Sequence, residues 1–181
     1  VNESMTQVMS PQTQTIWDIS SRAFNDRGDG LVAEKISPAD WIRLAKAGRK
    51  LRDRARLLAK APHITVAAPG EIIMGEGASH EGDKRTWDAA SAKQVQALID
   101  AHPALFIQHL NTLADAGDAI LQAAHRKDIK TVYEVSSQFD ETCDGCHQPF
   151  WGTDEPPPYP KDLAAAYGAS ALEPVGQSRG P

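Results

Sequence analysis

The sequence has only two cysteines, few aromatic residues and no apolar run long enough to span a bilayer. The missing apolar run argues against a transmembrane helix. No charged and apolar leader precedes the first residue, so we expect any secretory signal to be absent or already removed. A net charge of -5 argues against nucleic acid as a partner. The 181 residues, 41% apolar and 24% charged, are typical of one helical, globular domain that buries its core without disulfide staples.

Apolar residues recur at helical three-and-four spacing in four successive stretches. This pattern predicts an all-α fold with helices over residues 3–25, 37–61, 87–127 and 128–151. Pro11 falls inside the first stretch. That helix therefore either is kinked at the proline or begins there, with Ser10 as its N-cap.

The other helix boundaries are marked by capping residues and by a second proline. Ser37 followed by Pro38 predicts the start of the second helix, and Asp128 is the predicted N-cap of the last one. The apolar register of the third stretch continues across Pro103, which favours one long kinked helix. A short helix followed by a new helix that begins at Pro103 is the alternative.

The motif Cys143-Asp144-Gly145-Cys146-His147 contains both cysteines of the chain. The pattern C-x-x-C-H is typical of covalent haem c attachment, in which two thiols bond to the porphyrin and the histidine coordinates the iron. Residues three and four apart share a helix face, so all three side chains can address one flat macrocycle. A redox disulfide would be expected in a βαβ context, and a zinc site would need further ligands at finger-like spacing; neither pattern is present.

Other residues are weaker candidates for contact with the haem. His102 and His109 lie one heptad apart on an apolar stripe, which is typical of hydrogen-bonded core histidines; the alternative is an approach to the iron from the distal side. Met74 lies in a glycine-rich loop over residues 61–86, which more often simply covers a bundle. The basic face of the second helix is most often solvated, but it could pair with haem propionates or dock an acidic redox partner.

Four amphipathic helices with C-x-x-C-H near the end of the last one resemble the class II cytochromes c, the cytochrome c′ superfamily. Class I cytochromes c place the motif near the N-terminus instead. The stretch from Met5 to Trp17, with Pro11 inside it, and the pair Phe150-Trp151 after the motif resemble the low-spin, methionine-ligated branch. The resemblance covers residues 3–151 and implies an antiparallel four-helix bundle with one covalently bound haem c.

The resemblance also implies roles for individual residues. Cys143 and Cys146 would attach the haem and His147 would be the proximal ligand. In the low-spin branch a methionine of the first helix coordinates the iron, which implies Met5, with Met9 as the alternative. The implied function is electron transfer rather than enzymatic catalysis. Haem attachment of this kind takes place outside the bacterial cytoplasmic membrane, so the resemblance implies a periplasmic protein.

Two further expectations concern alternatives and partners. Without a methionine ligand, a five-coordinate iron would bind small gases such as NO and CO, as in cytochrome c′ proper; a peroxidase would need a distal histidine as its acid-base group. We expect residues 1–151 to form the cytochrome domain and residues 152–181, rich in proline, to form an extended tail. The expected partners are redox proteins, and a homodimer is implied by analogy alone.

Overall fold

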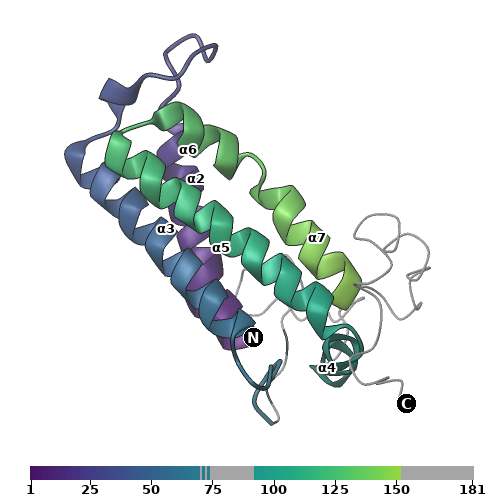
Figure 1. Cartoon of the computed structure of the whole chain (residues 1–181). Helices are drawn as coiled ribbons and strands as arrows, with labels where there is room; N and C mark the ends of the chain where they lie inside the picture. Colours follow the sequence, from purple (N-terminus) through teal and green to yellow (C-terminus); the bar gives the residue numbers. More distant parts are fainter. Residues whose placement is uncertain (70, 72, 74–91, 152–181) are drawn as a thin grey trace, which may run out of the picture. The chain divides into compact units, whose positions relative to one another are not determined.

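The computed structural model describes residues 1–69, 71, 73 and 92–151 (Figure 1). Helices make up 76% of these residues, and none of them lies in a strand, which confirms the predicted all-α class for this part of the chain. No described helix is long and apolar enough to cross a membrane. Two compact units can be distinguished. The antiparallel unit consists of Glu3–Ala61 and Leu110–Cys143; the motif unit consists of Val1–Asn2, Pro62–His109 and Asp144–Pro181.

One continuous helical segment opens the chain and comprises α1 (Asn2–Ser4), the π-helix η1 (Met5–Met9) and α2 (Ser10–Ser21). The N–H of Ser10 donates to the carbonyl of Met5, which is the five-residue spacing of a π-turn. Pro11, which has no N–H to donate, follows in the first turn of α2. Ser10 has helical dihedrals, φ -57° and ψ -46°, so the alternative in which it caps a new helix is wrong.

The connection from α2 to the next long helix is a tight turn. The N–H of Asn25 donates to the carbonyl of Gly30 at 2.8 Å, and Gly28 has a φ of 75°, which glycine adopts without strain. Residues 25–30 therefore form a turn that follows α2. A single 3-10 turn, η2 (Ala33–Lys35), completes the connection.

Helix α3 (Pro38–Ala59) begins as predicted, because the Ser37 hydroxyl accepts a hydrogen bond from the N–H of Asp40 at 3.1 Å. The same hydroxyl donates to the Asp40 carboxylate at 2.9 Å, and that carboxylate pairs with Arg22 at 3.1 Å and Arg43 at 3.0 Å. The bond from Ser37, supported by the two arginines, holds the pKa of Asp40 below its ordinary value. This carboxylate ties the end of α2 to the start of α3.

The third apolar stretch forms two helices, α4 (Ala92–Ala101) and α5 (Pro103–Arg126). The prediction of one kinked helix is therefore wrong, and its alternative is observed. Proline disfavours helical dihedrals in the residue before it, and His102 accordingly interrupts the helix. Its carbonyl accepts the first bond of α5, from the N–H of Phe106 at 3.2 Å.

The last apolar stretch is also divided, into α6 (Ile129–Ser136) and α7 (Phe139–Trp151). Asp128 caps α6 as predicted, accepting from the N–H of Thr131 at 3.1 Å. The break follows Ser136, whose carbonyl accepts a hydrogen bond from the indole Nε1 of Trp17 at 2.8 Å. A side chain of α2 thus donates a hydrogen bond to a backbone carbonyl at the point where α6 ends. The expectation of one uninterrupted helix is wrong.

In the antiparallel unit, α2 packs against both α3 and α6. Three successive contacts with α6 and α7 run in opposite sequence directions: Trp17 with Phe139, Ser20 with Ser136, and Phe24 with Tyr133. The α2–α6 pair is therefore antiparallel. The α2–α3 pair is antiparallel as well, because the ion pair between Arg22 and Asp40 joins the end of one to the start of the other. Figure 1 shows these helices lying alongside one another.

Helices α3 and α5 approach most closely at a pair of glycines. A Cβ added at Gly48 would lie 2.6 Å from the carbonyl oxygen of Gly117, and one added at Gly117 would lie 2.7 Å from the N of Arg52. The backbones therefore meet directly, which only glycine at both positions allows. The ion pairs between Arg52 and Asp118 (2.9 Å) and between Arg56 and Asp115 (3.9 Å) run in opposite sequence directions, so this pair is also antiparallel.

Candidate haem-attachment site

Helix α7 carries Cys143, Cys146 and His147 on consecutive turns. Because these residues are three and four apart in one helix, their side chains project from the same face, as the sequence pattern predicted. Both thiols are half-buried, and no disulfide joins them in α7. His147 is half-buried too, with its Nε2 atom screened from solvent. The helix therefore presents two half-buried cysteines beside one half-buried imidazole whose Nε2 is screened from solvent.

The motif is followed by a proline that sequence reasoning did not single out. Pro149 lies inside α7, is buried, and has no N–H to donate to the carbonyl of Gly145 four residues earlier. Gly145 stands between the two cysteines, and glycine constrains the backbone less than any other residue. This pair of residues leaves the turn that bears the thiols less constrained than a regular helix. The signal was present in the sequence, as a proline two residues after the histidine.

Aromatic side chains fix the end of α7 in the motif unit. Phe150 is 3% exposed and meets the ring of Phe106 edge-on at 5.2 Å between centroids. It also lies edge-on to His109 at 6.4 Å, and His147 meets Trp151 in the same manner at 5.3 Å. Such edge-to-face contacts orient the rings as well as burying them. The pair that follows the motif thus anchors the last turn of α7 on the first two turns of α5.

The two histidines of the third apolar stretch lie in different settings. His109 is 7% exposed, and burial lowers the pKa of its imidazole below the ordinary value, so it is neutral at pH 7. This agrees with the expected core role. His102 is half-buried in the break between α4 and α5, with its Nδ1 atom shielded from solvent. An approach of either histidine to iron stays a prediction.

The two candidate methionines of the first helix both lie in η1. Met9 is 1% exposed and belongs to the core of the antiparallel unit, whereas Met5 is half-buried. The π-helix η1 packs against α3. Both methionines belong to the antiparallel unit, while Cys146 and His147 belong to the motif unit, so the pairing of a methionine with His147 stays a prediction. Met74 and the predicted tail at 152–181 lie outside the described residues.

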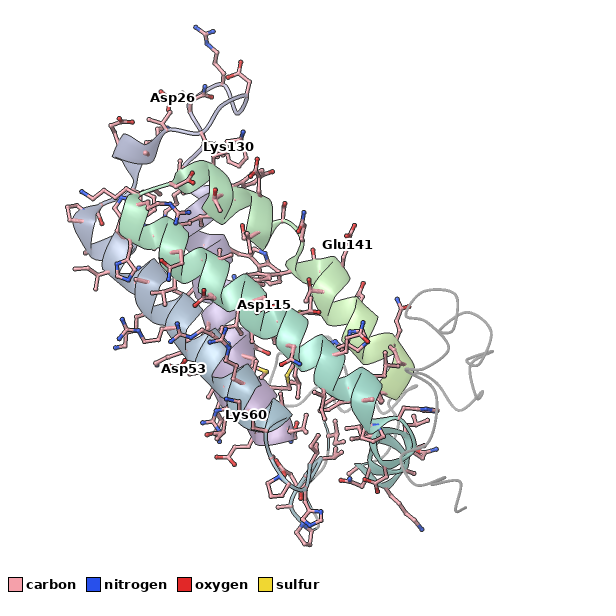
Figure 2. The ribbon with its side chains drawn as sticks, in the orientation of Figure 1. Asp26, Asp53, Lys60, Asp115, Lys130 and Glu141 are labelled. Atoms are coloured by element: carbon pink, nitrogen blue, oxygen red, sulfur yellow. The ribbon has the colours of Figure 1, made fainter. Side chains whose placement is uncertain are left out.

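The basic face of α3 is divided between paired and solvated cations. Arg52 pairs with Asp118 at 2.9 Å and with Asp53 at 2.8 Å, and these bonds raise the pKa of its guanidinium. Figure 2 shows the labelled Asp53 and Asp115 as side chains that project from α3 and α5. Part of the face that sequence reasoning treated as solvated is therefore used to join α3 to α5.

The residues of α7 fit the haem group that the motif implies. Covalent attachment needs two thiols that can be reached, and iron ligation needs one imidazole nitrogen, because the porphyrin supplies the in-plane ligands. Cys143, Cys146 and His147 supply the two thiols and the imidazole on one face of α7. In the described chain, no three or more His, Cys, Asp or Glu residues are grouped closely enough to hold a metal ion by themselves.

Comparison of the chain with protein families, with curated proteins and with solved structures found no match. The function is therefore inferred from the residues of α7 and from the packing of the helices.

Proposed function

We propose that the chain is a monohaem c-type cytochrome that carries electrons in the periplasm. The observation that supports this best is the placement of Cys143, Cys146 and His147 on one face of α7, with both cysteines half-buried and the imidazole Nε2 screened from water. Cys143 and Cys146 anchor the haem, and His147 is the proximal ligand. When bound, the haem supplies an iron that cycles between ferric and ferrous forms.

A class II, four-helix architecture is supported by the packing directions in the antiparallel unit. Helix α2 runs opposite to α3 and α6, and α3 runs opposite to α5. Helices α5 and α6 are joined by a tight turn through Asp128, as neighbours in an up-down bundle are. A motif in the last helical segment of such a bundle is the arrangement of the class II cytochromes c.

A methionine of η1 is proposed as the sixth ligand, with Met5 preferred and Met9 as the alternative. Met5 is the more accessible of the two, whereas Met9 already fills the core. A thioether ligand raises the reduction potential and leaves no open position on the iron, which favours electron transfer over substrate chemistry. Redox proteins are the corresponding partners.

Attachment is tested by expressing the chain for export in a bacterium with haem c maturation enzymes. The wild type should keep its haem after denaturation, detected by the mass of the denatured protein and by haem staining. The double variant Cys143→Ser/Cys146→Ser should lose it, and His147→Ala should change the spectrum of any haem that remains. Asp144→Asn, a change between the two cysteines, is the matched control and should keep the haem.

A wild-type chain without covalent haem, or a double variant that retains it, would contradict the proposal. Zinc content measured on the same samples separates a structural zinc site from haem attachment.

The spin state then distinguishes electron transfer from gas binding. For the wild type we expect a low-spin spectrum with a sulfur-to-iron charge-transfer band, and slow binding of CO to the ferrous protein. Met5→Ala should abolish the band and open the iron to CO, whereas Met9→Leu, which keeps the core filled, should leave the band in place. A high-spin wild type that binds CO and NO rapidly would favour the five-coordinate, gas-binding alternative.

A further inference from the structure

A pocket of about 430 Å³ lies in the antiparallel unit, between the first turns of α3 and the end of α5. Its apolar wall includes Trp41, which is 6% exposed, and Ile42, which is 70% exposed. Ile42 has the largest exposed fraction among the large apolar side chains of the described chain. The volume lies within the range of small-molecule sites, which combine apolar walls with a few polar groups.

Basic side chains line the remainder of this pocket, and no Asp or Glu is among its described lining residues. The basic lining residues are Lys46, Arg49, His125 and Lys127. This accumulation occurs in a chain whose net charge is -5. A cavity lined by one sign of charge concentrates ligands of the opposite sign.

The two lysines and the arginine of this lining differ from the other basic residues nearby in having no carboxylate partner among the described residues. Further along α3, Arg52 and Arg56 pair with aspartates of α5, and at its start Arg43 pairs with Asp40. Neither Lys46, Arg49 nor Lys127 takes part in any ion pair of the described residues. Asp128, the carboxylate next to Lys127 in the sequence, accepts two bonds from Thr131.

Lys127 has a φ of 55°, the only positive φ at a non-glycine residue in the described chain. It occupies the position after α5 where helices favour glycine, since its N–H donates to Ala124 and the N–H of Asp128 donates to Ala123. A side chain in this conformation costs about 1 kcal/mol or more. Strain of this kind is concentrated at functional sites, and here it places a lysine in the lining of the pocket.

We infer that this pocket binds a small organic anion in which a carboxylate or similar group is joined to an apolar or aromatic body. The apolar body packs against Trp41 and Ile42, and the anionic group is held by Lys46, Arg49 and Lys127. This inference is independent of the proposed haem, because none of these residues belongs to α7.

The test is calorimetric titration of the full chain, as purified, with 1-naphthoate. The neutral analogue 1-naphthalenemethanol shares its aromatic body, and acetate shares its charge. Naphthoate should bind with one-to-one stoichiometry and roughly tenfold or more tighter than either comparison compound, since a charge-assisted hydrogen bond is worth that ratio. Lys46→Glu and Lys127→Glu should each weaken naphthoate binding by about tenfold.

Lys50→Glu is the matched control, because it makes the same charge change on α3 outside the pocket lining. It should alter naphthoate binding only slightly, and circular dichroism should show the same helical content in all variants. Equal affinity for naphthoate and its alcohol would mean an apolar hollow without anion selectivity and would overturn the inference. Equal losses in the Lys50 and Lys46 variants, or no binding of naphthoate, would overturn it as well.

Discussion

Substituting Gly48 by alanine should destabilise the antiparallel unit although alanine is the better helix former. The new Cβ would lie 2.6 Å from the carbonyl oxygen of Gly117 and 2.8 Å from the backbone nitrogen of Leu121. Neither is the end of a flexible side chain, so the helices themselves must move. To regain ordinary contact at 3.4 Å they must separate by roughly 0.8 Å.

A gap of that size forfeits a quarter to a half of the dispersion energy between the facing atoms, including the contact at Ile120. Overpacking of this kind costs about 1–3 kcal/mol or more. The gain from replacing a helical glycine by alanine is about 1 kcal/mol. Because the nearest atoms are backbone, the upper part of the overpacking range, about 2–3 kcal/mol, applies. We therefore expect Gly48→Ala to lower the free energy of unfolding by about 1–2 kcal/mol net.

The measurement is denaturant unfolding followed by helical circular dichroism. Gly117→Ala should destabilise the protein similarly. The double variant should lose less free energy of unfolding than the two single variants lose in sum, because the first substitution already separates the helices. Gln122→Ala, at an exposed position of α5, is the control and should change stability by less than about 0.5 kcal/mol. A Gly48→Ala protein as stable as the wild type would refute the close contact.

Three further outcomes follow from single contacts. Lys127→Gly should raise the free energy of unfolding by about 0.5–1 kcal/mol by relieving the left-handed backbone, whereas Lys127→Ala, which keeps the strain, should leave it nearly unchanged in the same denaturant experiment. The folded-state pKa of Asp40 lies below its ordinary value of 3.8, so the stability that its carboxylate contributes is present above pH 3.8 and is lost as the pH falls through the folded-state pKa. The melting temperature of Asp40→Asn should therefore depend less on pH in this acid range than that of the wild type. An equal pH dependence of the two melting temperatures would contradict this. Trp17→Phe should cost about 1–2 kcal/mol by removing the indole bond to Ser136, while Tyr133→Phe, which keeps its ring contact with Phe24, should be nearly neutral in thermal unfolding.

Local signals in the sequence were sufficient where the deciding interactions are local. Ser37 and Asp128 cap helices through bonds to residues three positions later, and both caps were predicted. The face shared by the motif residues of α7 follows in the same way from helical spacing. In contrast, the break after Ser136 depends on Trp17, which is 119 residues away in sequence. Likewise, Gly48 and Gly117 lie far apart in the sequence, and only the fold brings them together.

The break at His102 is a different case, because its local signal, Pro103, competed with an apolar periodicity that continues across the proline. The apolar register continues across Pro103, and that continuity favoured one helix over two. The observed break follows the backbone restriction that proline places on the residue before it. Backbone chemistry at the proline therefore outweighed the side-chain periodicity.

The first helix combines these effects and bears on the iron ligand. In a regular α-helix Met5 and Met9, four residues apart, would share one face. The π-turn adds one residue, so the buried positions are instead Ser4 and Met9, five apart, followed by Thr13. Met5 is thereby turned partly away from the core that Met9 fills. The half-buried Met5 has less packing to lose than Met9, so its coordination of iron would cost less stability. Met5→Ala should therefore change the haem spectrum much more than it changes unfolding, and Met9→Ala should do the reverse.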